Sequence, residues 1–305
     1  MQERYISFFT DYGFKRLFGS EPTEICLIDF LNSLLDGKES PIVDLQYRNP
    51  ENLDPNELDR KGILDFYCFT SDGTRFVVEL QKAKQKFFKD RALFYSTFPL
   101  QEQALKGEWD VKLGKVYTVA ILDFDFKEDA DHPEKYFYEI KHKVTETNKG
   151  FYDKLTFIYL AMRKFKKKPH ELQTSQDKWL YAIKHLSELE TIPEELNSEV
   201  FGRFFSLAEI AKLNPRERQG YEQSLKYYRD LNNVIATAFD KGKEEGKTEG
   251  KAEGLAKGKL MAILELRFDT LAEGQLQKIN SATLDQLNRW ILKAKSARSS
   301  IEVFS

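Results

Sequence analysis

The fold is decided by the stretch Gly62-Ile-Leu-Asp-Phe-Tyr-Cys-Phe-Thr-Ser-Asp-Gly-Thr-Arg-Phe-Val-Val-Glu-Leu-Gln81. It predicts two strands joined at Ser71-Asp72-Gly73, because Asp or Ser followed by Gly is a strong hairpin signal. The length of the loop sets the register. A three-residue loop with a left-handed Gly73 places Asp65 directly across from Glu79. A two-residue loop shifts the pairing by one residue and puts the two acids on opposite faces.

The three-residue register gives the strand pair one fully apolar face, and this separation favours it over the alternative. The other face carries Asp65, Glu79 and Gln81. Like charges directly opposite each other destabilise a sheet, unless a hard cation lies between them. Mg²⁺ prefers oxygen ligands and typically takes one or two carboxylates, together with water and phosphate. The pair is therefore a candidate metal site. The alternative is two ordinary polar residues on a solvated sheet face.

The composition is that of a folded protein. The chain has 305 residues, of which 41% are hydrophobic, and this is enough for a substantial core and for more than one domain. Its 24 Phe and 14 Tyr residues argue against a disordered chain. The net charge of -2 gives no general basicity. Any contact with nucleic acid would therefore have to come from a local basic patch.

The cysteines and histidines show no spacing typical of a disulfide framework or a zinc site. Cys26 and Cys68 lie in apolar stretches, and the four histidines are scattered. The first residues lack the pattern of a signal peptide, and no apolar stretch is long enough to span a membrane. We therefore expect a protein of the reducing cytoplasm with no membrane partner.

Residues 1–165 have the pattern of an α/β domain. The predicted elements are a helix at 25–35, a strand at 41–47, the hairpin, a helix at 84–106, and strands at 115–123, 136–144 and 155–162. The predicted order is therefore helix, three strands, helix and strand, followed by further strands.

Three segments follow this domain. Residues 166–240 have apolar side chains at helical spacing and are predicted to form a helical extension. Residues 241–259 contain Gly-Lys-x-Glu repeats, and each glycine destabilises a helix by roughly 1 kcal/mol against alanine, so we expect a marginal helix or a linker. The alternative is close pairing with a second such helix. Residues 260–305 are predicted to form a small helical tail that packs on another surface, a second chain included.

These features together resemble the PD-(D/E)XK nuclease superfamily, and within it the recombination-promoting nuclease (Rpn) and transposase family. The resemblance rests on the order of the elements, on the acid of the second strand and on the Glu-x-Gln of the third. Further family-like motifs lie at Asp11–Gly19, Phe87–Tyr95, Gln103, Gly107 and Val116–Asp123. The resemblance covers the whole chain. It implies a restriction-endonuclease-like αβββαβ core with a helical C-terminal region.

The resemblance also assigns roles to residues of the hairpin. Asp65 and Glu79 take the positions of the two metal-binding acids, and Gln81 stands where most members of the superfamily carry lysine. Glutamine can orient an attacking water but cannot offset the charge of a transition state. Lys15 is a candidate substitute for that lysine. The alternative is a salt bridge between Lys15 and Asp11 on one helix.

A basic segment follows the hairpin. The implied DNA-binding groove includes Lys84, Lys86, Lys89 and Arg91. Contacts with phosphate carry no sequence information, so binding is expected to depend on salt and to be largely neutral to sequence. Arg91 and Tyr95 lie one helical turn apart, and we expect them either to contact a phosphate or to brace the site.

The function that the resemblance implies is a Mg²⁺-dependent DNA endonuclease, with Mn²⁺ or Ca²⁺ as alternative ions, linked to recombination, mobile elements or defence against foreign DNA. The alternative is a weak or inactive nuclease fold that serves as a DNA-binding or oligomeric scaffold, with residues 241–305 forming a homo-oligomer. A transposase with an integrase-like acidic triad fits less well. That class needs acids far apart in the sequence, whereas Asp65 and Glu79 lie on one hairpin.

Overall fold

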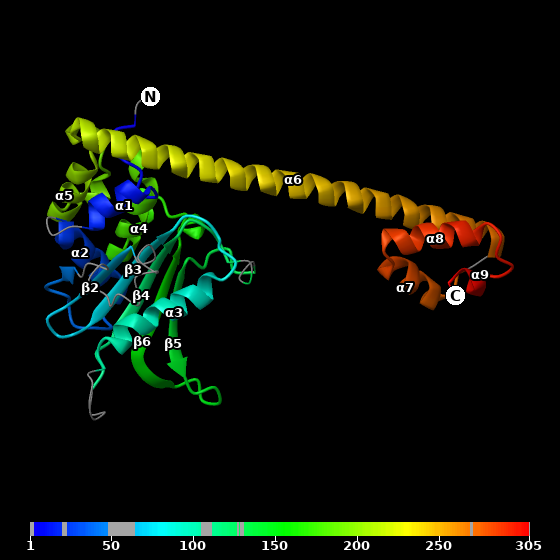
Figure 1. Cartoon of the computed structure of the whole chain (residues 1–305), viewed down its shortest axis with the longest axis horizontal. Coiled ribbons are helices and arrows are strands. Elements are labelled where there is room, and N and C mark those ends of the chain that lie inside the picture. The colour runs from blue at the N-terminus through cyan, green and yellow to red at the C-terminus, as the bar shows by residue number, and fades with distance from the viewer. Residues whose placement is uncertain are drawn as a thin grey trace. The chain divides into compact units, whose positions relative to one another are not determined.

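The structure is a computed structural model that describes residues 3–19, 23–47, 65–104, 112–126, 128, 131–268 and 271–304. The chain divides into two compact units, Met1–Tyr228 and Arg229–Ser305. The first unit is a mixed α/β fold built on a six-stranded sheet (Figure 1). This confirms the predicted class, and the order helix, three strands, helix and strand is also as predicted.

The sheet combines parallel and antiparallel strands in the order β1-β2-β3-β4-β6-β5. The central strands β3, β4 and β6 run parallel, and the other neighbours are antiparallel. The strand bounds are β1 Gln46–Tyr47, β2 Phe66–Phe69, β3 Arg75–Gln81, β4 Val116–Leu122, β5 Phe137–Lys143 and β6 Gly150–Ala161. The prediction of a strand at 41–47 was wrong for 41–45, where the chain is irregular, and β6 begins before the predicted 155.

The hairpin has the three-residue register. Phe66 pairs with Val78 and Phe69 with Arg75, and the backbone N–H of Thr70 donates to the carbonyl of Thr74 at 2.9 Å. Gly73 has φ +85°, a conformation that favours glycine, so the predicted left-handed position is confirmed.

Four helices cover one face of the sheet and share the main core with it (Figure 1). These helices are α1 Asp11–Phe18, α2 Glu24–Leu35, α4 Ser175–His185 and α5 Glu199–Ala208. Trp179 of α4 lies at the centre, with its ring 5.9 Å from that of Phe30 and 5.2 Å from that of Phe204. Aromatic side chains bury large apolar areas, so this cluster is a major source of stability.

One helix, α3 Phe88–Gln101, lies across the other face of the sheet (Figure 1). Its buried residues Phe88 and Ala92 pack into a second, smaller core with side chains of β4 and β6. The helix begins four residues later than the predicted start at 84 and contains Pro99 in its last turn. The helix ends at Gln101, so the prediction was wrong for 102–104, and the predicted end at 106 lies outside the described residues.

The longest helix, α6 Pro215–Phe268, begins in the first unit and continues into the second. Its first turns are held to α1, since Arg16 forms an ion pair with Glu217 at 2.6 Å and the hydroxyl of Ser224 accepts from the N–H of Tyr12 at 3.1 Å. The repeats at 241–259 are helical throughout. Among the helices that the structure describes, none is both long and apolar enough to cross a membrane.

The second unit has a core of its own. The last turns of α6 pack against three short helices, α7 Glu273–Ser281, α8 Leu284–Ala294 and α9 Ser300–Val303. Leu260, Leu264 and Leu287 are fully buried there. The tail thus buries part of its apolar surface within its own chain, whereas the sequence suggested packing on another surface.

We predict that Gly13→Ala destabilises the protein. A Cβ at position 13 of α1 would lie 2.1 Å from the backbone carbonyl oxygen of Ser7, so the backbone would have to move. Overpacking of this kind typically costs about 1–3 kcal/mol. Gly202→Ala in α5 is the matched control, because a Cβ there meets no described atom within 4 Å. Thermal unfolding that shows equal losses for both variants would contradict this account.

Candidate active site

Asp65 and Glu79 lie side by side at the end of the hairpin. The register of β2 and β3, extended by one residue, places Asp65 opposite Glu79, and Glu79 pairs with Ala120 on its other side. Glu79 is only 4% exposed, and Asp65 is half-buried. The face that carries Glu79 is therefore packed against the rest of the fold and is not solvated at that residue.

The carboxyl group of Asp65 is held by the backbone and perturbed by its surroundings. Its Oδ2 accepts the N–H of Leu80 at 2.8 Å, which fixes the side chain against β3. Burial raises the pKa of Asp65, and the charge of Asp11 raises it further, while the bond from Leu80 and the charges of Lys15 and Lys82 act in the opposite direction.

Glu79 is the more strongly perturbed acid. Burial and the charge of Asp65 raise the pKa of Glu79 to about 7, and the charge of Arg91 opposes this rise. Two buried carboxylates close together cannot both be ionised easily without a cation. The pair therefore favours either a shared proton or a bound cation near neutral pH.

The donor chemistry of the pair fits a divalent cation. Oε1 of Glu79 is buried and has no hydrogen-bond partner in the described part of the chain. A buried polar oxygen without a partner costs free energy that a bound cation would recover. Within the described ranges no group of three or more His, Cys, Asp or Glu side chains could hold a metal. An ion here would thus have two carboxylate ligands, with water and phosphate completing its shell, as Mg²⁺ accepts.

The side chain of Gln81 is engaged with the helix that covers this face. Gln81 is 8% exposed; its Oε1 accepts from Nη2 of Arg91 at 2.9 Å, and its Nε2 donates to the carbonyl of Ala83 at 3.0 Å. Nη1 of Arg91 donates to Oε1 of Gln85. The sequence grouped Arg91 with the DNA-binding lysines. The structure joins Arg91 to Gln81 and, through its charge, to Glu79.

Lys15 and Asp11 form the salt bridge that the sequence offered as the alternative. Nζ of Lys15 lies 3.2 Å from Oδ2 of Asp11, and both side chains are more than half exposed. Both charges act on Asp65, so the first turns of α1 lie near the acid pair.

Lys82 is a neighbour whose importance the sequence did not reveal. Simple alternation along β3 would turn Lys82 to the face opposite Glu79 and Gln81. In the structure its Nζ lies 5.8 Å from the ring centre of Tyr227, and Asp11 and Asp65 both act on its charge. Burial is the larger effect and lowers the pKa of Lys82.

The remaining basic residues of the segment after β3 are exposed. Lys84 and Lys86 are in contact with solvent, and Lys89 pairs with Glu128 at 3.4 Å. They lie directly after Gln81 in the chain, so their charges are available beside the site for a polyanion.

Asp123 was not among the predicted site residues, although it follows β4 at the same edge where Gln81 ends β3. Its N–H donates to the carbonyl of Gln81 at 2.9 Å. Its carboxylate accepts from Nε of Arg163 at 2.9 Å and from the hydroxyl of Tyr228 at 2.7 Å. The signal that could have found it is positional, because side chains at the carboxyl ends of parallel strands gather at one edge.

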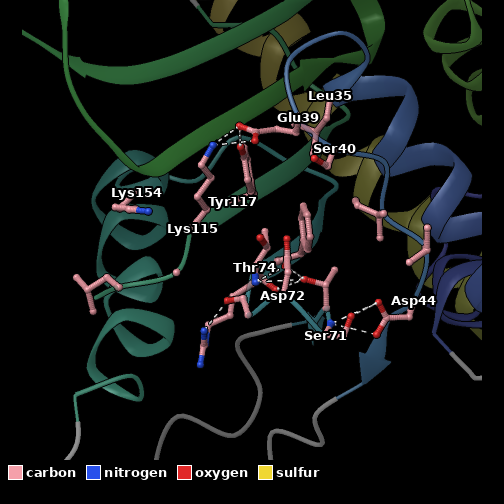
Figure 2. Close-up of a pocket in the computed structure, with 18 of the residues that line it drawn as sticks. Leu35, Glu39, Ser40, Asp44, Ser71, Asp72, Thr74, Lys115, Tyr117 and Lys154 are labelled. Atoms are coloured by element: carbon pink, nitrogen blue, oxygen red, sulfur yellow. Dashed lines mark hydrogen bonds and ion pairs between the residues drawn. The ribbon is translucent and has the colours of Figure 1, made fainter. Parts of the chain in front are cut away.

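A cavity of about 660 Å³ lies at the other end of the hairpin. Figure 2 shows its lining, in which Glu39 binds Lys115 at 2.6 Å and Tyr117 at 2.7 Å, and Asp44 accepts from Ser71. Neither Asp65 nor Glu79 lines this cavity. It is therefore separate from the acid pair.

Comparison with known proteins identifies the family of this fold. The model of a family described as "PD-(D/E)XK nuclease family transposase" matches residues 8–238. This segment contains the hairpin, α3 and the first turns of α6, and nucleases of this type generally use divalent metals. No curated protein and no solved structure matches the chain.

We predict that the metal-free protein loses stability as the pH rises from 5 to 8. The pKa of Glu79 is raised in the folded state, so the protonated form favours folding at low pH and this contribution disappears as the pH passes about 7. The effect is on the order of 2–3 kcal/mol. Melting temperatures measured in EDTA should fall more steeply with pH for the wild type than for Glu79→Gln.

The matched control for this prediction is Asp153→Asn. The hydrogen bond from Lys115 and then its charge lower the pKa of Asp153, so this carboxylate stays ionised between pH 5 and 8. Saturating Mg²⁺ should restore the stability of the wild type at pH 8 but should add little to Glu79→Gln. Identical pH profiles for the wild type and Glu79→Gln would contradict the assignment.

Proposed function

The chain belongs to the PD-(D/E)XK nuclease family of transposases, and from this premise we propose that it is a metal-dependent DNA endonuclease. The proposed reaction is hydrolysis of a phosphodiester bond, with Mg²⁺ as the ion and Mn²⁺ or Ca²⁺ as the alternatives to test. The observation that carries the proposal is the pairing of the half-buried Asp65 with the buried Glu79, whose Oε1 has no hydrogen-bond partner among the described residues.

Asp65 and Glu79 are the proposed metal ligands. A divalent cation in such a site activates a water and neutralises charge on the displaced phosphate. The bond from Leu80 holds Asp65 in place, and the packing around Glu79 excludes bulk water from the carboxylate. Because little water surrounds the carboxylates, the local dielectric constant is low and electrostatic interactions with a bound substrate are stronger.

Gln81 is proposed to orient the attacking water. Its two described hydrogen bonds use one of its two N–H donors and one lone pair of its oxygen. The amide therefore retains capacity for a water molecule. Lys15 is the weaker candidate for a catalytic cation, because Asp11 at 3.2 Å offsets its charge and solvent screens it.

The substrate contacts are proposed to come from the basic segment that follows β3 and runs into the first turn of α3. It includes Lys84, Lys86, Lys89 and Arg91. Exposed lysines bind phosphates through long-range attraction, so affinity should fall as salt rises. We place the protein in the cytoplasm, with roles in recombination, mobile elements or defence against foreign DNA. The buried free thiols of Cys26 and Cys68 are compatible with a reducing compartment.

We predict that the purified protein nicks plasmid DNA with Mg²⁺ and that Asp65→Asn greatly slows this cleavage. The amide keeps an acceptor for the N–H of Leu80, so the variant removes the charge with little change to the hairpin. Loss of a metal ligand should raise the activation free energy of cleavage by several kcal/mol. The rate should then fall by on the order of a hundredfold or more. Gel assays with Mg²⁺, Mn²⁺, Ca²⁺ or EDTA measure this.

The control for the cleavage assay is Asp153→Asn, which removes an exposed acid from the same sheet. It should cut like the wild type. Cleavage by Asp65→Asn at the wild-type rate would contradict the proposed metal site.

A second candidate function is an oligomeric scaffold, and the exposed apolar residues of the C-terminal unit favour it. Leu255, Leu266, Leu292 and Ile301 are all more than 60% exposed, although the unit has a core of its own. Apolar side chains of this kind supply the contacts when a second protein covers a surface. We propose that residues 241–305 form a homo-oligomer.

Deletion of residues 241–305 distinguishes the two functions. The first compact unit ends at Tyr228, so the shortened chain keeps the hairpin, α3 and the first turns of α6. We predict that it still cleaves DNA, with lower self-association in sedimentation experiments. The scaffold is favoured by the opposite result. In that case the full-length protein assembles without cutting DNA, and the truncated protein binds DNA but neither cuts nor assembles.

A further inference from the structure

We propose that Arg91, held by Gln81, is a catalytic residue that contacts the scissile phosphate and neutralises the charge that develops on it. This inference rests on the proposed function and identifies the side-chain cation that acts together with Asp65 and Glu79 in cleavage. It also gives Gln81 a second role, as the positioning residue for that cation.

The first argument is the way in which Arg91 is held. One terminal nitrogen donates to Gln81 at 2.9 Å and the other to Gln85, so two residues fix the plane of the guanidinium. The guanidinium carbon lies 5.9 Å from the ring centre of Tyr95, one turn further along α3. Groups fixed before the substrate binds lose little entropy in the reaction, which is the condition for effective electrostatic catalysis.

The second argument is unused bonding capacity at the same place. Nε of Arg91 is buried and has no hydrogen-bond partner in the described residues. The nearby Oε1 of Glu79 is likewise buried and unpaired. A donor on a cation and an acceptor on an acid are thus both left unsatisfied at one site. A phosphate oxygen satisfies the donor, and an ion bound to that phosphate satisfies the acceptor.

The third argument is that the charge of Arg91 is not neutralised by an ion pair. No carboxylate lies within 4 Å of it in the ranges that the structure describes. Its charge still acts on Glu79, so the guanidinium lies within electrostatic range of the acid pair. A guanidinium stays protonated at all working pH values and binds phosphate with parallel N–H bonds, so it supplies charge without giving up a proton.

Other cations near the site are worse placed for this role. Asp11 offsets Lys15, and both Asp11 and Asp65 act on the partly buried Lys82. Lys84 and Lys86 are exposed and therefore suit binding of the DNA backbone.

The pairing also explains why position 81 carries glutamine. A lysine there would place a second cation against Arg91, whereas the amide oxygen accepts its N–H bond. The cation that the strand lacks is then supplied from α3.

The test measures kcat and KM for DNA cleavage by the full-length protein at saturating Mg²⁺. Arg91→Gln should lower kcat by about 10²–10³-fold, the usual effect of losing one preorganised donor at a developing charge, with KM changed only a few-fold. Lys89→Gln, on the same helix, should raise KM and spare kcat, as expected of a phosphate contact alone. Arg218→Gln is the neutral control, because this exposed residue pairs with Glu222 on α6.

Moving the charge gives a readout that a structural role would not produce. Gln81 lies on the same face of β3 as Glu79, so Gln81→Lys in the Arg91→Gln background returns a cation to the site. The double variant should recover at least tenfold in kcat over Arg91→Gln, and Arg91→Lys should retain partial activity. Melting temperatures identify any variant that fails to fold, and the two lysine variants then decide the question.

The outcomes separate this inference from the proposed function. A wild type that cuts no DNA with any divalent ion overturns the proposed function, and the role of Arg91 falls with it. If the wild type cuts DNA but Arg91→Gln keeps its kcat and only raises KM, the catalytic role of Arg91 is overturned and the proposed function stands. The same holds if activity is lost in Arg91→Gln and the folded double variant recovers none.

Discussion

The three-residue turn at 71–73 is the constraint on which the rest of the structure depends. The carboxylate of Asp72 accepts the N–H of Thr74 at 2.9 Å, and Gly73 takes the left-handed conformation that closes the turn. A slip of one residue would turn every side chain of one strand to the opposite face. With the observed register, Phe66 and Val78 enter the core beneath α1 and α2, and Asp65 lies across from Glu79. The same turn thus determines both the main core and the acid pair.

The acid pair is unfavourable for the stability of the metal-free fold. Burial raises the pKa values of both acids, and a neighbouring negative charge raises each further, that of Asp11 for Asp65 and that of Asp65 for Glu79. The hydrogen bond from the N–H of Leu80 and the charges of Lys15 and Lys82 oppose the rise for Asp65. The surrounding packing has to compensate, and the aromatic cluster around Trp179 is large enough to contribute. Repelling buried carboxylates in an otherwise well-packed fold are typical of a functional site. This supports a functional origin for the pair.

Patterns that are local in sequence predicted much of this structure. Alternation and turn chemistry gave the register of the hairpin, and continuous apolar runs gave β4 and β6. Contacts between distant elements could not be predicted in the same way. The bond between Gln81 and Arg91 depends on how α3 packs on the sheet, and that between Asp123 and Tyr228 on where α6 begins. The repeats at 241–259 were expected to be a marginal helix or a linker, because glycine weakens helices, and in the structure they are helical as part of α6.

The position of Arg91 relative to Glu79 follows from one row of residues across the sheet. Glu79 pairs with Ala120, and Ala120 pairs with Tyr159, so the three side chains lie side by side on the face beneath α3. Phe88, at the start of α3, packs its ring 5.3 Å from that of Tyr159. Arg91 is one helical turn further on, where its charge meets Glu79. Phe88, Ala120 and Tyr159 share the smaller core beneath α3. A cation carried by this helix is therefore placed by the same packing that buries the acid, and need not come from the strand itself.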